Sequence, residues 1–176
     1  MSIGDDLLER AGKVRLAVFD VDGVMTDGRI GYTDDGREFK TFHTRDGLGI
    51  KGLISNDIEV AIITARQSAI VDRRADELGL THVIQGREDK ARALDELLER
   101  TGLHGGDLAY TGDDLVDWPA MRACGLKCAP ADASLWLRQR ADFITTRPGG
   151  HGAVREVCEL ILQGHGLLEA WQGRFV

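Results

Sequence analysis

The sequence predicts an α/β fold, in which a parallel sheet lies between two layers of helices. Two observations lead to this prediction. Short apolar runs rich in β-branched residues alternate along the chain with longer segments of helical periodicity. The chain has 176 residues, of which 43% are hydrophobic, and this suits a single domain with a substantial core. Such alternation joins parallel strands through crossover helices and so builds a three-layer sandwich.

The expected strands are the apolar runs themselves, at residues 15–19, 58–63, 82–84, 108–110, 126–129 and 142–144. The expected helices lie between them, at roughly 46–56, 67–79, 88–100, 115–123 and 133–140, and a last helix starts near 151. In the helix at 88–100, one face carries Ala91, Leu94, Leu97 and Leu98. The predicted architecture is therefore a Rossmann-like parallel sheet flanked by helices.

Residues 28–43 interrupt this alternation. Two short runs of alternating polar and apolar residues flank Asp34-Asp35-Gly36, and an Asp-Gly pair between such runs is a hairpin signal. We therefore expect a β-hairpin inserted after the first strand. The whole chain, residues 1–176, is expected to form one domain, with a C-terminal tail at about 164–176.

The composition excludes several classes of protein. The net charge is −7 and no basic run occurs, so we expect no nucleic acid as a partner. Residues 1–12 are too polar for a signal peptide, and no apolar stretch is long enough for a membrane span. The three cysteines lack CxxC spacing and are expected to be reduced thiols. These features predict a cytoplasmic protein that does not bind membranes.

Charged or hydroxylated side chains follow several of the predicted strands. Asp20 and Asp22 come directly after the first strand, Thr64 follows the second, and Asp113 follows the fourth. Lys90 opens the helix after the third strand. Because ligands of open α/β sheets bind at the carboxyl ends of the strands, we expect these side chains to surround one site.

These residue types suit phosphoryl transfer. The carboxylates of Asp20, Asp22 and Asp113 favour a hard cation with oxygen ligands, for which Mg²⁺ is the best candidate. One carboxylate can attack phosphorus, and an acid two residues along an extended chain lies on the same side and can move protons. The hydroxyl of Thr64 and the amine of Lys90 can hold the phosphoryl oxygens.

The motifs "DVDGVMTDG", "IITAR", a downstream lysine and "TGDDLVD", in this order, resemble the four motifs of the haloacid dehalogenase superfamily. The resemblance implies a phosphomonoesterase in which Asp20 is the nucleophile, Asp22 is the general acid/base, and Thr64 and Lys90 hold the phosphate. It implies that Mg²⁺ is bound by Asp20, by the backbone carbonyl of Asp22 and by Asp113. Two further residues would lie in the outer metal shell or orient ligands, namely Asp114 and Asp117.

The spacing of these motifs leaves no room for a cap domain. Relatives with a large cap insert it between the first and second motifs or between the second and third. Here only 41 residues separate Asp22 from Thr64, and 25 separate Thr64 from Lys90. A capless site is open to water, so the resemblance implies either a large substrate or a neighbouring chain that covers the site.

Longer stretches narrow the resemblance further. The segments "FHTRDGLGIKGL", "LGLTHVIQG", "YTGDDLVDWPAM" and "GGHGAVREVCELIL" are similar to the family of phosphatases that act on 3-deoxy-D-manno-octulosonate 8-phosphate in lipopolysaccharide biosynthesis. Members are capless homotetramers, in which the hairpin builds the tetramer and the C-terminal tail reaches a neighbour's site. Besides Asp22 and Lys90, the resemblance implies that the substrate is contacted by His43, Thr44, Arg45, Asp46, Gly47, Lys51, Arg66 and Arg74.

The expected function is therefore Mg²⁺-dependent hydrolysis of this sugar-acid phosphate through an aspartyl phosphate. Arginine suits such a substrate, because guanidinium groups pair bidentately with carboxylate and phosphate. The chain departs from the family at His43, Lys51 and Ala65, where the family commonly has Asn, Arg and Gly.

Other functions stay open at this point. A phosphatase of the same chemistry could act on a nucleotide or on another sugar-acid phosphate, like the phosphatase-like domain attached to some sialic-acid cytidylyltransferases. A non-catalytic phosphatase-like assembly domain would share the fold. A signalling receiver domain would need an aspartate after the third strand, where Gln85-Gly86 stand instead.

The site residues also have structural interpretations. Asp20 and Asp22 could form a helix cap and a turn, and Thr64 could cap the helix at 67–79. Lys90 could be a solvated lysine, and Asp117 could lie on the exposed face of its short helix. Residues 149–152 could be a flexible turn or a helix N-terminus that binds an anion. Four residues could be ordinary surface groups, namely Arg45, Lys51, Arg66 and Arg74.

Overall fold

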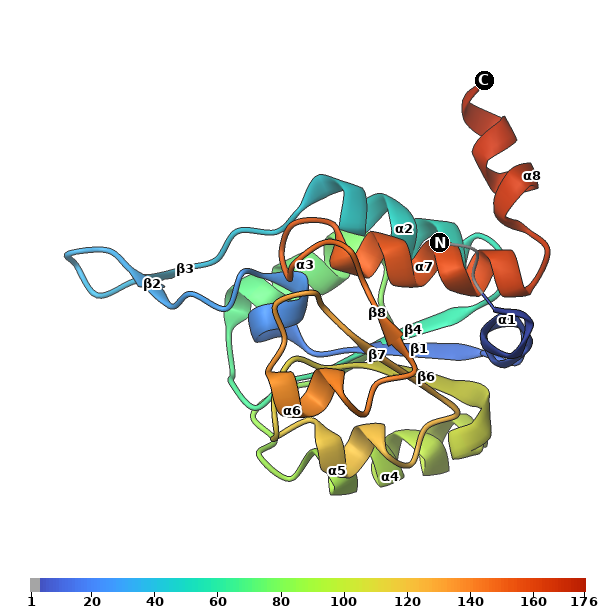
Figure 1. The fold of residues 1–176 in the computed structure, drawn as a ribbon. Helices are drawn as coiled ribbons and strands as arrows, with labels where there is room; N and C mark the ends of the chain where they lie inside the picture. Colours follow the sequence, from blue (N-terminus) through green and yellow to red (C-terminus); the bar gives the residue numbers. More distant parts are fainter. Residues whose placement is uncertain (1–3) are drawn as a thin grey trace.

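The computed structural model describes residues 4–176 and confirms the parallel sheet between two helical layers (Figure 1). Six strands pair in the order β5-β4-β1-β6-β7-β8, and all neighbouring strands are parallel. Every predicted apolar run forms a strand, with ends shifted by at most one residue. The strands are β1 (Leu16–Phe19), β4 (Glu59–Ile63), β5 (His82–Ile84), β6 (Leu108–Thr111), β7 (Leu126–Ala129) and β8 (Phe143–Ile144).

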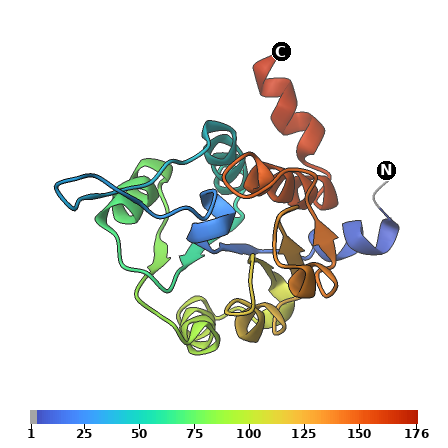
Figure 2. The ribbon, with the colours of Figure 1, turned by 60° about the vertical axis from the view of Figure 1, so that its left-hand side comes forward.

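The helices form one layer on each face of the sheet (Figures 1 and 2). Both faces of the sheet are apolar and need to be covered. In β1, Ala17 and Phe19 pack into the core on one face, and Leu16 and Val18 pack into the core on the other. One layer contains α1 (Asp5–Ala11), α2 (Thr44–Ile54), α3 (Ala69–Leu78) and α7 (Ala153–Gly164); the other contains α4 (Lys90–Thr101), α5 (Trp118–Met121) and α6 (Leu135–Arg138). Within the described residues, none of the helices is long and apolar enough to cross a membrane.

Two helices lie outside the predicted set. The first is α1, whose sequence DDLLERA has one fully buried residue, Ala11, so its local pattern is weak. It packs along α7, and a Cβ at Gly164 would come within 2.7 Å of the Ala11 Cβ. The second is α8 (Leu168–Gln172) in the tail, which is anchored by Trp171 beneath the Arg155 guanidinium, 4.6 Å from the ring centroid. Both helices depend on contacts that are remote in sequence.

The hairpin is present but shorter than the predicted segment. Its antiparallel strands are β2 (Gly31–Tyr32) and β3 (Glu38–Phe39), and Gly36 turns the chain with a φ of 80°. It projects from the body of the protein (Figure 1). A two-stranded ribbon is marginal by itself, which explains the short pairing. No inserted cap domain occurs in the described part of the chain, as predicted.

The strand order places the ends of three strands at one edge. β1 lies in the centre, between β4 and β6: the chain adds β4 and β5 on one side of it and β6, β7 and β8 on the other, so the strand order reverses beside β1. The register sets Phe19 opposite Ile62 on one side and Thr111 on the other. The residues that follow these strands, Asp20 and Thr64 among them, therefore meet at the switch point where ligands of such sheets bind.

Candidate active site

A buried ion-pair triad lies at the end of β1. Asp20 follows the strand and is 5% exposed, and Lys90, the first residue of α4, is 2% exposed. The Lys90 Nζ lies 2.9 Å from Asp20 Oδ1 and 2.6 Å from Asp117 Oδ1. The interpretation of Lys90 as a solvated lysine is therefore wrong. The Lys90 side chain extends from the start of α4 to the end of β1, where its amine contacts two carboxylates.

Asp117 connects this triad to the loop after β6. Its Oδ2 accepts hydrogen bonds from the backbone N–H groups of Asp113 at 3.0 Å and Asp114 at 3.3 Å. Its Oδ1 also accepts from the Tyr110 hydroxyl at 3.2 Å. Asp117 is fully buried, so its placement on an exposed helix face is wrong. The side chain instead fixes the backbone that carries Asp113.

Three carboxylates come together here. Oxygens of Asp20, Asp113 and Asp117 all lie within 4.8 Å of one another. The segment after β1 approaches them closely, because a Cβ at Gly23 would come within 2.1 Å of Asp113 Oδ2. Gly23 also has a φ of 92°, which favours glycine. Three acids against one lysine leave excess negative charge, so the cluster fits a hard divalent cation.

The electrostatics of the cluster support this interpretation. Burial raises the pKa of Asp20 to about 7, repulsion from Asp117 adds to the rise, and Lys90 opposes it. Burial and the charges of Asp117 and Asp20 likewise raise the pKa of Asp113 to about 7. Burial acts to lower the pKa of Lys90, but Asp20 and Asp117 outweigh it and raise the value. A cation among the carboxylates would favour their ionised forms.

The carboxylate of Asp22 points away from this cluster. Its Oδ1 lies 2.5 Å from Lys40 Nζ, and its Oδ2 lies 3.8 Å from Arg66 Nε. The side chain is 21% exposed, against 7% for that of Asp20. No sequence motif pointed to Lys40. The available signal was the period-2 pattern that puts Glu38 and Lys40, an acid and a base, on the same side of the hairpin strand.

Thr64 stands where the motif pattern predicts, at the end of β4. It is 2% exposed, and its backbone bonds to the end of β5 and the residues after it, accepting from Arg87 N–H at 3.2 Å and donating to the Ile84 carbonyl at 3.0 Å. The N-cap position of α3 is taken by Ser68. The interpretation of Thr64 as the helix cap is therefore wrong.

Comparisons with known proteins show the family to which the chain belongs. No protein-family model matches the chain. A curated protein of Yersinia pestis, the 3-deoxy-D-manno-octulosonate 8-phosphate phosphatase KdsC, is 48% identical over 171 residues, which cover 97% of this chain and 91% of the relative. The KdsC protein of Escherichia coli K12 is 45% identical over 174 residues, covering 99% and 93%. The chain belongs to the KdsC family of phosphatases.

A solved structure also resembles it closely. The Moraxella catarrhalis 3-deoxy-D-manno-octulosonate 8-phosphate phosphatase, crystallised with a magnesium ion, a phosphate ion and a KDO molecule, matches with a TM-score of 0.96 at 43% identity. The match covers 99% of this chain and 100% of that one. The fold expected from the resemblance to haloacid dehalogenases is thus confirmed for this KdsC-family chain.

The predicted substrate contacts at the start of α2 differ in exposure: Thr44 and Arg45 are exposed, whereas Asp46 is buried. His43 caps α2, where its Nδ1 accepts from the Arg45 N–H at 3.3 Å, and Thr44 and Arg45 are exposed beside it. Asp46 is 3% exposed, and its Oδ1 accepts from the Arg155 N–H at 2.8 Å in the first turn of α7. The chain's own carboxylate thus occupies the helix N-terminus that the sequence analysis left open for an anion.

The predicted arginines lie on the α3 side of the site. Arg66 is 40% exposed, pairs with Glu38 at 3.2 Å and donates to the Tyr32 hydroxyl at 3.3 Å. Arg74 packs under Phe42, at 5.6 Å from the ring centroid, and against Gly47, where a Cβ would meet its Nη2 at 2.5 Å.

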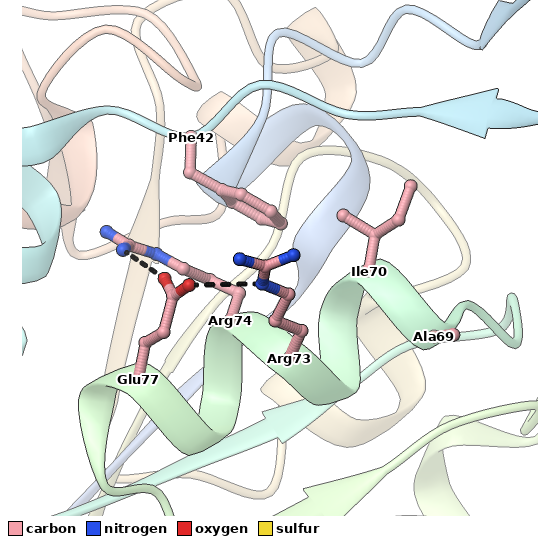
Figure 3. A pocket seen from close by; sticks show the side chains of 6 residues that line it. All are labelled: Phe42, Ala69, Ile70, Arg73, Arg74 and Glu77. Atoms are coloured by element: carbon pink, nitrogen blue, oxygen red, sulfur yellow. Dashed lines mark hydrogen bonds and ion pairs between the residues drawn. The ribbon is translucent and has the colours of Figure 1, made fainter.

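Arg74 also lines a surface pocket of about 490 Å³, in which Glu77 bridges Arg73 and Arg74 (Figure 3). None of the clustered aspartates lines this pocket, so the pocket and the aspartate cluster do not form one cavity. Lys51 is exposed and lies nearly two turns from Thr44, about 10 Å along α2. Asp114 is also exposed.

We predict that Asp20 and Asp113 destabilise the metal-free protein progressively as the pH rises from about 4 to about 7. Asp20 and Asp113 have folded-state pKa values near 7, above their ordinary value of 3.8, so the folded state binds more protons than the unfolded state in this window. Each group contributes a slope of at most about 1.4 kcal/mol per pH unit. Urea unfolding in EDTA should show a flatter profile for Asp113→Asn and an unchanged one for Asp34→Asn in the exposed hairpin turn. An unchanged slope in Asp113→Asn would contradict the assignment.

We predict that Lys90→Met destabilises the metal-free protein by about 3–5 kcal/mol, because it leaves two buried carboxylates without their cation. Adding Asp117→Asn in the same chain should recover part of this loss. Lys13→Met is the matched control, since Lys13 forms a pair with Glu9 at 2.7 Å that is open to water and therefore contributes little to stability. Chemical denaturation with chelator measures all three, and equal losses for Lys90→Met and Lys13→Met would refute the prediction.

Proposed function

We propose that this chain hydrolyses 3-deoxy-D-manno-octulosonate 8-phosphate to the free sugar acid and phosphate, as a Mg²⁺-dependent phosphomonoesterase. One observation carries the proposal. Asp20 stands at the switch point of the sheet between Asp113 and Lys90, in a chain 48% identical to a KdsC phosphatase. A nucleophile, a cation site and a buried amine are thereby assembled at the edge where ligands bind.

The acidic cluster fits Mg²⁺. Carboxylate oxygens of Asp20 and Asp113 would hold the ion, together with the backbone carbonyl of Asp22. When bound, Mg²⁺ supplies positive charge that offsets the repulsion between the anionic nucleophile and the anionic phosphate. Asp117 supports the site, because it orients the Asp113 backbone and shares Lys90 with Asp20. Asp114 would lie further out.

The first chemical step forms an aspartyl phosphate. A carboxylate oxygen of Asp20 attacks phosphorus while the bond from phosphorus to the sugar oxygen breaks, and Asp22 gives its proton to that oxygen. Lys90 and Thr64 hold the phosphoryl oxygens as charge moves among them. Lys90 already lies 2.9 Å from Asp20, so it requires little reorganisation.

The second step restores the enzyme. Asp22, now ionised, takes a proton from a water molecule as the water oxygen attacks the phosphorus of the aspartyl phosphate. The bond between phosphorus and the Asp20 oxygen breaks, which releases inorganic phosphate. The same two carboxylates therefore act in both steps, with their roles separated by position rather than by residue type.

The sugar acid is recognised by cations near the site. The net charge of the chain is −7, but Arg45, Arg66 and Arg74 lie along the edge next to α2 and α3. Their guanidinium groups suit the substrate carboxylate. We also assign substrate contacts to the remaining residues of the predicted set, namely His43, Thr44, Asp46, Gly47 and Lys51.

We predict Mg²⁺-dependent phosphate release from 3-deoxy-D-manno-octulosonate 8-phosphate, at least about tenfold faster in kcat/KM than from N-acetylneuraminate 9-phosphate, ribose 5-phosphate or a nucleotide. EDTA should abolish the reaction and Mg²⁺ restore it. Asp20→Asn should remove turnover while a thermal melt shows that the variant is folded. Preference for another member of the panel would keep the mechanism and overturn the substrate. The absence of phosphate release from every substrate would favour a non-catalytic assembly domain.

We further propose that the chain acts as a cytoplasmic homotetramer. The projecting hairpin carries three exposed apolar side chains, Ile30, Tyr32 and Phe39, each more than half exposed, and such residues favour contact with another copy. The free cysteines Cys124, Cys128 and Cys158 are all buried, and burial raises the pKa of Cys124 to about 12, which fits unreactive thiols in a reducing compartment.

We predict that Ile30→Glu on the hairpin dissociates the assembly, because it places a charge in the apolar contact. Light scattering should give four times the 19.3 kDa chain mass for the wild type and a smaller mass for the variant. Leu135→Glu is the control, since Leu135 is 64% exposed but lies on α6, away from the hairpin. A monomeric wild type, or equal dissociation by both variants, would argue against the hairpin interface.

A further inference from the structure

Lys40 is a buried lysine with no role in the function described so far. It directly follows β3 of the hairpin, and its side chain is 2% exposed although the backbone there is partly open. Its amine lies 2.5 Å from Asp22 Oδ1 and 3.3 Å from Glu38 Oε1. A lysine amine is seldom buried without paired charges, so these two contacts define its position.

Glu38 holds the other side of this lysine. Its Oε2 accepts from the Ser68 hydroxyl at 2.7 Å, and its Oε1 lies 3.2 Å from Arg66 Nη2. The hydrogen bond from Ser68 lowers the pKa of Glu38, burial opposes this, and Lys40 lowers it further. Glu38 is thus an anion anchored to the segment that follows β4. The hairpin base is tied through it to the second motif and through Lys40 to the first.

The two acids of the first motif therefore have separate lysines. Asp20 is held by Lys90, which comes from α4, and Asp22 is held by Lys40, which comes from the hairpin. Lys40 donates a hydrogen bond to Oδ1 of Asp22, while Oδ2 lies 3.8 Å from Arg66 Nε, which is beyond hydrogen-bond distance. One oxygen of the carboxylate is fixed, and the other is left for proton transfer.

We propose that Lys40 is a positioning residue, which fixes the Asp22 carboxylate so that its second oxygen faces the leaving oxygen of the substrate. The inference rests on the role of Asp22 in the proposed function. Direct contact of Lys40 with substrate is disfavoured by its 2% exposure and by the two carboxylates that already surround its amine. The hairpin then has a second task, since it supplies a part of the catalytic site of its own chain.

The test compares two leaving groups. A sugar alkoxide needs a proton as it leaves, whereas p-nitrophenolate leaves without one, so loss of a well-placed acid affects only the sugar phosphate strongly. We expect Lys40→Met to slow the first turnover of the sugar phosphate by roughly 10²-fold, as for a misplaced catalytic group, and to leave that of p-nitrophenyl phosphate nearly unchanged. Quenched flow with enzyme in excess isolates this step from the later attack of water.

A double-mutant cycle makes the test specific to Asp22. Asp22→Asn should show the same selective loss, and Lys40→Met added to Asp22→Asn should cost nothing more if Lys40 acts through Asp22. Arg37→Met is the matched control on the hairpin, since Arg37 is 84% exposed and pairs with Asp35 at 2.6 Å. It should leave both substrates unaffected.

Each outcome decides between defined alternatives. Equal losses on both substrates, or full additivity with Asp22→Asn, would show that Lys40 only supports the fold and would overturn the inference. A rise in KM alone, confined to acidic sugars, would make Lys40 a substrate contact and also overturn it. If Asp22→Asn itself shows no selectivity between leaving groups, the proposed role of Asp22 fails. Should Lys40→Met not fold, Lys40→Gln, which lacks the charge but keeps a donor, carries the same comparison.

Discussion

The contact of one buried lysine with two buried carboxylates organises this protein. Lys90 reaches Asp20 at 2.9 Å and Asp117 at 2.6 Å, with almost no exposure of any of the three side chains. Two buried acids would repel each other and resist ionisation without that cation. Through Asp117 the same contact fixes the loop that carries Asp113. The lysine therefore links α4, β1 and the end of β6, and the metal-binding oxygens take their positions from it.

The second acid of the first motif is stabilised in another way. Asp22 leaves the metal cluster and meets Lys40, a residue of the hairpin. In the proposed mechanism, a segment that projects from the body, and whose apolar side chains suit contact with other copies, is thereby connected to proton transfer. Because the described part of the chain has no cap domain, the proposed mechanism places the control of the general acid at the base of the hairpin. The proposed assembly and the proposed chemistry then share one structural element.

The predictions from sequence succeeded where local pattern carries the information. All six strands lie within one residue of the apolar runs, because strands buried on both faces read as continuous apolar segments. Prediction failed for α1 and for the interpretation of Asp117 as exposed. Helix α1 is stabilised by α7, more than a hundred residues away. Asp117 directly precedes a helix of only four residues, which is too short for periodicity to show which face is buried.

The sequence by itself determined the fold class, the order of the strands along the chain and the acids, hydroxyl and lysine that follow them, because each depends on neighbouring residues. The tertiary structure decided which of these groups meet. Whether Lys90 is solvated or buried, and whether Asp22 faces the cluster or the hairpin, follows from charges brought together across the sheet edge. The role of Lys40 was likewise decided by the tertiary structure, since only the folded chain places its amine 2.5 Å from the carboxylate of Asp22, 18 residues earlier.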